Sequence, residues 1–248
     1  MVETLILFFT ALVATALSSM SGGGASVINV PVMLWLGIPF PLAISTQKVS
    51  SAFWVLPAAY NYLKGRLIDW RFLLIFSSLG LVGSYLGVLI IIKTNQRIME
   101  IVVGVLILVL VVYTYSHKDV GLAEHKNYSL FRQALTYPFA LVLGFYESIF
   151  GSGNGILMAI ITFYTKGFDF INALGYYFAV AFTWVVFAAG LLIAQGYFSW
   201  SVMIPVVFGS LIGGYVGSRY ARYQGNKFIK IVFGLFGSLL AIKLLLGF

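Results

Sequence analysis

The sequence contains no cysteine and few charged residues. Without cysteine there is no disulfide framework and no thiolate metal ligand. Only 9% of the 248 residues are charged and 61% are apolar, whereas about a quarter of a soluble domain is charged. The composition therefore predicts a polytopic membrane protein. The two histidines, His117 and His125, fall in one polar stretch, so we expect no metal centre, no cofactor and no enzyme active site.

Acidic residues are scarcer than basic ones, and the formal net charge is +8. In a soluble protein this excess would suggest nucleic acid as a partner, but in a membrane protein it indicates cationic loops on the cytoplasmic side. We therefore expect the lipid bilayer, and not nucleic acid, as the surrounding partner. The first 20 residues lack a basic n-region and an A-x-A-like site, which predicts a first membrane segment of a multi-pass protein in the cell inner (plasma) membrane.

Apolar segments occupy most of the chain. They cover 5–20, 25–36, 42–63, 70–92, 98–115, 137–150, 156–164, 170–194, 200–220 and 228–248. A spanning helix needs about 20 residues, a length that the first, second, sixth and seventh segments do not reach. These four form two pairs, each joined by a glycine-rich break, "SGGG" and "GSGNG". Their lengths favour helices that end inside the membrane, because roughly 16 residues at 1.5 Å each extend only about 24 Å.

The chain also repeats itself. With an offset of 130, Trp54 falls on Trp184 and Gly104 on Gly234. With an offset of 131, the first glycine triplet falls on the second break, so one residue of slippage separates the two matches. Chance likeness between glycine-rich helices is the alternative to a duplication. We predict a first repeat at 1–115, a cytoplasmic linker at 116–132 and a second repeat at 133–248.

Loop charges indicate how the two repeats are oriented. If each short pair crosses the membrane an even number of times, 11 basic residues face the cytoplasm and 3 face outside. The outer three are Lys93, Arg97 and Lys243. If each pair makes one crossing, the division is 7 against 7, so the positive-inside rule favours inverted repeats with both termini outside. The inner set is Lys64, Arg66, Arg71, Lys118, Lys126, Arg132, Lys166, Arg219, Arg222, Lys227 and Lys230.

The predicted fold is therefore all-α. It has two inverted repeats of about five helical segments each, and two pairs of short broken helices meet near the membrane midplane. Two inverted copies around a midplane site are a recurrent transporter plan. The "GxxxG" pairs at 83–87 and 213–217 predict close helix packing. For Trp54 and Trp184, core packing is favoured over a place beside a pore.

The two breaks predict an anion site. A helix that begins inside the membrane presents unpaired N–H groups and the positive end of its dipole. Glycine leaves those amides uncovered. The alternative is that the glycines only permit tight helix packing. Neighbouring hydroxyl and amide side chains add donors, which gives a predicted set of Ser21, Gly22, Gly23, Gly24, Ser26, Ser152, Gly153, Asn154 and Gly155.

Lys48 lies within the third apolar segment, where an ionisable side chain is costly and usually faces a cavity or a partner. With Thr46 and Gln47 it forms a polar, cationic patch that would attract an anion. Snorkelling to the membrane surface is the alternative. Glu147 precedes the second break and is either an ion-pair partner of Lys48 or a proton-coupling site.

These motifs resemble those of the sulfite exporter TauE/SafE family. The stretch "SGGGASVINVPVMLWLGIPFPLAISTQK" is similar to the family's opening motif, and "GFYESIFGSGNG" is similar to its second-half signature. The resemblance covers nearly the whole chain and implies an integral membrane protein that moves small sulfur-containing or organic anions. The matching motif residues are Gly22, Gly23, Gly24, Thr46, Lys48, Glu147, Gly151, Gly153 and Gly155.

Two positions depart from the family pattern. Gln47 stands where asparagine is common, and the repeat places Phe178 opposite Lys48, so only one half supplies a cation. We expect a transporter of small anions such as sulfite, a sulfonate, sulfoacetate or an organic acid, with protons as a candidate coupling ion. A passive anion channel would use paired half-helices equally well. A non-transporting scaffold leaves the two polar breaks unexplained.

Overall fold

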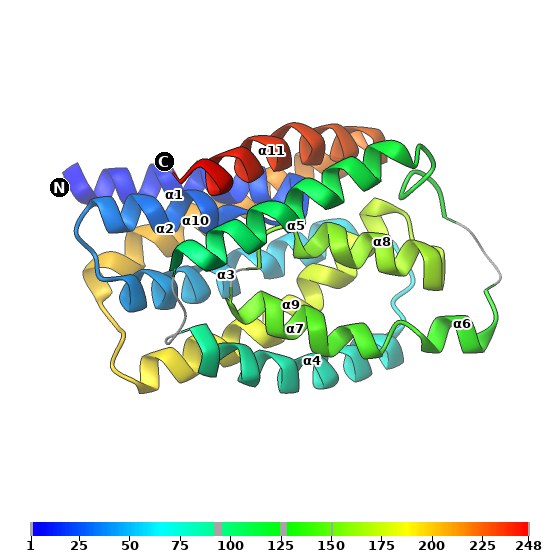
Figure 1. Cartoon of the computed structure of the whole chain (residues 1–248), viewed down its shortest axis with the longest axis horizontal. Coiled ribbons are helices and arrows are strands. Elements are labelled where there is room, and N and C mark those ends of the chain that lie inside the picture. The colour runs from blue at the N-terminus through cyan, green and yellow to red at the C-terminus, as the bar shows by residue number, and fades with distance from the viewer. Residues whose placement is uncertain (1, 92–95, 125–127, 150, 248) are drawn as a thin grey trace.

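The computed structural model describes residues 2–91, 96–124, 128–149 and 151–247. The described chain is helical throughout (Figure 1), and Lys93, His125 and Lys126 lie outside it. Its helices are α1 (Val2–Ser21), α2 (Ala25–Trp35), α3 (Phe40–Leu63), α4 (Trp70–Ile91), α5 (Gln96–Ser116), α6 (Leu130–Ala134), α7 (Pro138–Ile149), α8 (Asn154–Lys166), α9 (Phe170–Ala194), α10 (Trp200–Gln224) and α11 (Asn226–Leu246).

Five helices of the described residues are long and apolar enough to cross a membrane, namely α1, α4, α9, α10 and α11. The expectation that the first segment is short is wrong, because α1 has 20 residues. It begins before the apolar run, at Val2, and takes Glu3 into its first turn. A carboxylate is favourable there because it faces the positive end of the helix dipole.

The other three segments predicted to be short are short. α2 has 11 residues, α7 has 12 and α8 has 13. α3 has 24 residues, enough to span, but it lacks a continuous apolar surface because it carries buried polar side chains between Ser45 and Ser51. α6 is an additional five-residue helix at the end of the predicted linker, where the Ser129 side chain caps it by accepting from Arg132 N–H.

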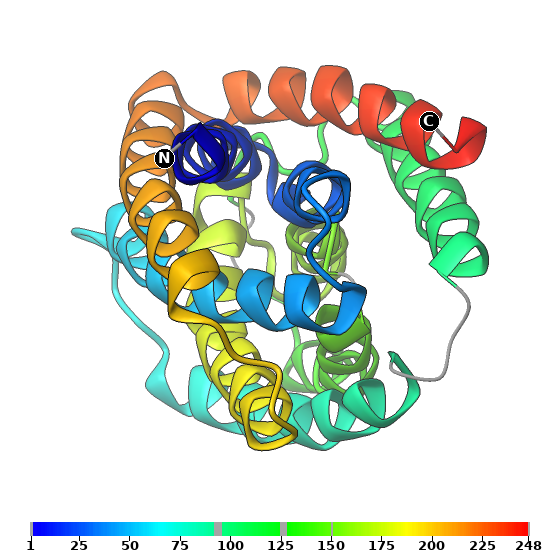
Figure 2. The same ribbon diagram turned by 90° about the vertical axis from the view of Figure 1, so that its left-hand side faces the viewer.

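The helices pair in a reciprocal pattern. α1 packs along α10, and α7 packs along α4. α3 contacts both α9 and α10, α9 also contacts α4, and α5 lies against α11. In the end-on view of Figure 2, α4, α5, α10 and α11 lie on the outside, around α1, α2, α7 and α8. The start of α1 and the end of α11 lie toward one end of the molecule, and α6 lies at the other (Figure 1).

Small residues allow the closest of these contacts. A Cβ on Gly213 would meet the Leu12 carbonyl group of α1, and one on Gly217 would lie 2.8 Å from Ala16 Cα. In the matching pair, a Cβ on Gly83 would lie 2.8 Å from the Phe145 backbone nitrogen of α7. The packing interpretation of both "GxxxG" motifs is therefore confirmed, since the helix backbones touch where the side chain is missing.

We expect Gly213→Ala to lower the thermal unfolding midpoint of the purified protein. The added methyl would lie 2.9 Å from the Leu12 carbonyl carbon, and overpacking of this kind costs about 1–3 kcal/mol. Gly190→Ala is the matched control, because a Cβ on this helical glycine meets nothing within 4 Å. Equal midpoints for the two variants would contradict the packing role.

Candidate functional site

The two glycine breaks lie against each other. Gly155 N–H donates to the Gly22 carbonyl at 2.8 Å, and a Cβ on Gly23 would lie 3.0 Å from the Gly153 backbone nitrogen. Gly23 and Gly24 have φ values of 129° and 124°, a region that residues with a side chain rarely adopt. Glycine is therefore required here both for backbone conformation and for close approach.

The amides at the start of α8 already have partners within the protein. Besides the bond from Gly155, Asn154 N–H donates to the Gly151 carbonyl at 3.3 Å and Ile156 N–H to the Gly153 carbonyl at 3.1 Å. α8 starts at Asn154, two residues earlier than predicted, which moves Asn154 and Gly155 into its first turn. At the first break, Gly23 N–H donates to the Ser18 carbonyl at 2.9 Å and Val27 N–H to the Gly24 carbonyl at 3.1 Å.

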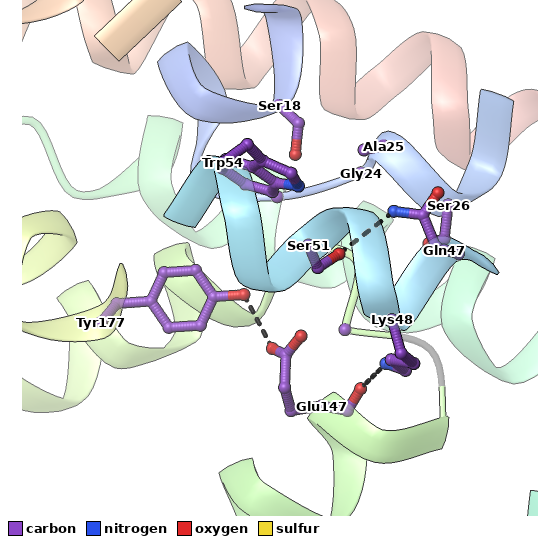
Figure 3. Close-up of a pocket in the computed structure, with 12 residues that line it drawn as sticks. Ser18, Gly24, Ala25, Ser26, Gln47, Lys48, Ser51, Trp54, Glu147 and Tyr177 are labelled. Atoms are coloured by element: carbon purple, nitrogen blue, oxygen red, sulfur yellow. Dashed lines mark hydrogen bonds between the residues drawn. The ribbon is translucent and has the colours of Figure 1, made fainter. Parts of the chain in front are cut away.

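A small polar cavity lies at the other break, beside the start of α2 (Figure 3). Its volume is about 20 Å³, enough for roughly one water molecule. Four of the helices that enclose it are α1, α2, α3 and α9. The lining residues are Ser18, Gly23, Gly24, Ala25, Ser26, Gln47, Lys48, Ser51, Trp54, Glu147, Gly151 and Tyr177.

Five of the predicted substrate-binding residues line this cavity, together with Glu147. The five are Gly23, Gly24, Ser26, Gln47 and Lys48. The others are buried around it: Ser21, Gly22, Thr46, Ser152, Gly153, Asn154 and Gly155. Several of them hold the lining in place. Ser152 Oγ lies 2.9 Å from Ser26 Oγ, and the Ser21 hydroxyl donates to the Gly23 carbonyl at 3.1 Å.

Lys48 points inward from α3. Its side chain is 4% exposed, and its ammonium group donates to the main-chain carbonyl of Glu147 (Figure 3). The snorkelling alternative is therefore wrong. The predicted ion pair takes a different form as well, because the direct contact is with the Glu147 carbonyl and not with its carboxylate.

The carboxylate of Glu147 has its own donors. Tyr177 Oη donates to Glu147 Oε2 at 2.7 Å from α9, and Asn154 Nδ2 donates to the same oxygen at 2.8 Å from α8. Glu147 is 6% exposed and lines the cavity with Lys48. A cation and a carboxylate from opposite halves of the chain therefore face the same small space.

A hydrogen-bonded row of side chains orients Gln47. Asn29 Nδ2 of α2 donates to Gln47 Oε1 at 2.9 Å, and Gln47 Nε2 donates to Ser51 Oγ one turn further along α3 at 3.2 Å. Asn29 was not predicted to take part. The spacing of Gln47 and Ser51 by four residues is a signal that could have identified Ser51, since such residues share a helix face.

Six lining residues are absent from the predicted binding set. Ser51 and Trp54 lie four and seven residues after Gln47 on α3, so helical periodicity could have identified them. Gly151 belongs to the second break. The sequence around Ser18, Ala25 and Tyr177 gives a weaker indication of a place at the site, and Ser18 and Tyr177 reach the cavity only through tertiary packing.

The described residues contain no group of three or more histidine or acidic side chains that could hold a metal.

A helical bundle with several apolar spans and a charged cavity buried among them defines a multi-pass membrane protein with an internal polar site. Comparison with known protein families identifies the family to which this membrane protein belongs. The model of the family described as sulfite exporter TauE/SafE matches residues 7–244. The chain belongs to this family of membrane transporters.

Curated relatives cover most of the chain. A probable membrane transporter protein of Haemophilus influenzae is 29% identical over 231 residues, which is 91% of this chain and 88% of the relative. A probable membrane transporter protein of Sinorhizobium, ORF9, is 28% identical over 240 residues, covering 96% and 91%. The Escherichia coli protein YfcA, also described as a probable membrane transporter, is 22% identical over 244 residues, covering 97% and 88%.

We expect Gly23→Ala to destabilise the protein more than Gly37→Ala. Both glycines have positive φ, at 129° and 79°, so both substitutions carry backbone strain of about 1 kcal/mol or more. A Cβ at Gly37 meets nothing within 4 Å, whereas one at Gly23 would press on Gly153 and Gly151 of the second break. The difference between the two thermal midpoints reports the contact between the breaks together with the greater backbone strain at φ 129°, and equal midpoints would argue against the contact.

Proposed function

We propose that this protein moves small anions across the membrane, and that the cavity beside α2 is its substrate site. The observation that carries the proposal is Lys48, a cation 4% exposed within α3 whose side chain lines that cavity. Burying an ammonium group is costly unless a partner compensates. Among the described residues its hydrogen-bond partner is the uncharged Glu147 carbonyl, and the Glu147 carboxylate faces it across the cavity, so an anion entering the cavity gains a charge-assisted contact with the ammonium group.

The start of α2 adds to the attraction. Gly24 and Ala25 line the cavity, and no side chain caps the helix at Gly24. The positive end of the α2 dipole therefore favours negative charge at the same place as Lys48. The first turn of α8 bonds instead to the Gly22 and Gly151 carbonyls. Of the two helix starts, that of α2 lines the cavity and that of α8 does not. A site with one helix start and one lysine fits a singly charged sulfite-like, sulfonate or carboxylate group, in line with the family's name.

Alternating access between two inverted repeats is the proposed mechanism. It is supported by the reciprocal pairing of α1 with α10 and α7 with α4, and of α3 with α10 and α9 with α4. In the proposed repeat, α1 corresponds to α7, α3 to α9 and α4 to α10. Replacing each helix by its counterpart turns the first pairing of each set into the second. A cavity of about 20 Å³ holds roughly one water, so an anion with several oxygen atoms enters only when the helices separate.

The proposed orientation places the α6 end in the cytoplasm. At this end Arg66 pairs with Asp169 at 3.0 Å, and Lys230 donates to the His117 carbonyl at 3.0 Å. Arg97 lies instead beside the last turn of α11, where it donates to the Leu244 carbonyl at 2.8 Å. The basic side chains thus separate toward two ends in the way that the positive-inside rule requires.

We expect Lys48→Met to reduce anion uptake into proteoliposomes by at least about tenfold, since a hydrogen bond to a charged group contributes roughly 1.5–3 kcal/mol. Methionine retains the length of the side chain and removes the charge. Lys64→Met, on an exposed lysine just after α3, is the matched control. Normal uptake by folded Lys48→Met would exclude the assigned role. Ohmic current in place of saturable exchange would favour the passive channel.

Glu147 is the proposed proton site for coupling. A bound anion and an ionised Glu147 would repel each other across the same cavity, so proton uptake by Glu147 would favour anion binding. We expect Glu147→Gln to remove the stimulation of uptake by an imposed proton gradient, measured with methanesulfonate, which stays ionised throughout. Glu3→Gln, at the exposed start of α1, is the control. Wild-type stimulation by the gradient in Glu147→Gln would leave Glu147 as a structural acceptor only.

A further inference from the structure

Two polar atoms in the cavity wall lack a hydrogen-bond partner within the described chain. They are the hydroxyl of Ser18 on α1 and the indole Nε1 of Trp54 on α3. Ser18 is 0% exposed and Trp54 is 4% exposed, and both line the cavity. Buried polar side chains are nearly always satisfied in native proteins. Other unpartnered groups, such as Ser45 and Thr46, lie outside the cavity lining.

A neighbouring serine and the repeat-related tryptophan have partners within the protein. Trp184, which the repeat places opposite Trp54, donates from Nε1 to the Ser77 carbonyl at 2.9 Å. Ser19, the residue after Ser18, donates to the Ala16 carbonyl at 2.9 Å. Unpartnered hydroxyl groups also occur outside the cavity, as at Ser45 and Ser210, so the inference rests on the two unpartnered atoms whose residues line the cavity.

We propose that the Ser18 hydroxyl and the Trp54 indole N–H are substrate-binding donors that hold an oxygen atom of a bound oxyanion. The inference rests on the proposed function and adds to it the residues that recognise the oxygen. Figure 3 shows Ser18 and the nitrogen of Trp54 on the side of the cavity where Gly24 and Ala25 begin α2, away from Lys48 and Glu147. The site thus has a charged side and a neutral donor side.

The chemistry of the donors limits the ligand. An indole N–H can only donate, and a serine hydroxyl rotates to donate or accept. The ligand must therefore present an acceptor atom to Trp54 while carrying negative charge toward Lys48. Sulfite, sulfonate and carboxylate groups have several acceptor oxygens and meet both demands. The cavity of about 20 Å³ also has room for one water molecule, which can accept from the same donors.

The test is a sulfite titration of the purified full-length protein, followed by thermal unfolding, because a ligand that binds the folded state raises the midpoint by mass action. The variants are Trp54→Phe, which removes the N–H and retains an aromatic ring, and Ser18→Ala. Their matched controls are Trp184→Phe and Ser19→Ala. Each control loses a hydrogen bond within the protein, so it tests the effect of lost stability on the titration without touching the cavity wall.

We expect the apparent dissociation constant for sulfite to rise by roughly tenfold in Trp54→Phe and in Ser18→Ala, and to stay at the wild-type value in both controls. Ser18→Ala keeps the test decisive if Trp54→Phe does not fold. Wild-type affinity in the cavity variants would overturn the inference and leave the proposed function standing, with a water as the partner of both donors. If sulfite, thiosulfate, sulfoacetate and acetate all fail to stabilise the wild-type protein, the proposed function and the inference both fall.

Discussion

The hydrogen bond from Gly155 N–H to the Gly22 carbonyl joins the two halves of the chain at their breaks. Non-helical backbone inside a membrane protein is tolerated only where other protein groups or a polar cavity satisfy it. Here one bond satisfies both breaks, because the second supplies the N–H donor and the first supplies the carbonyl acceptor. The cavity lies beside this contact, so its shape depends on the two glycine segments approaching to backbone distance.

This contact also makes the site asymmetric. Backbone amides at both helix starts have partners within the protein, but Gly24 and Ala25 at the start of α2 line the cavity, whereas Asn154 and Gly155 at the start of α8 do not. Lys48 adds a cation from the first half, and its repeat counterpart Phe178 packs in an aromatic cluster with Tyr62 and Trp54. The second half contributes Glu147 and Tyr177 instead. The two halves of the chain thus contribute complementary charges to the cavity, one cationic and one acidic.

The membrane class, the family and most helix bounds could be predicted, because the length of each apolar segment and the position of each glycine-rich break can be read locally from the sequence. α1 was underestimated because Glu3 and Thr4 interrupt the apolar pattern but not the helix. The inward direction of Lys48 was one of two alternatives, since snorkelling and burial give the same sequence pattern. The hydrogen-bond partner of Lys48 could not be predicted, because every residue has a backbone carbonyl and the sequence does not indicate which one accepts the bond.

The sequence by itself determined that this chain spans a membrane, that glycine interrupts two short helix pairs, and that Lys48 and Glu147 are the unusual charges. Those conclusions follow from composition and spacing. Only the tertiary structure decided that the breaks touch, that the cavity lies at α2 and not α8, and that Ser18, Trp54 and Tyr177 line it. The physical reason is that a cavity is formed by the packing of helices distant in sequence, and its wall depends on rotations and backbone contacts that no local pattern records.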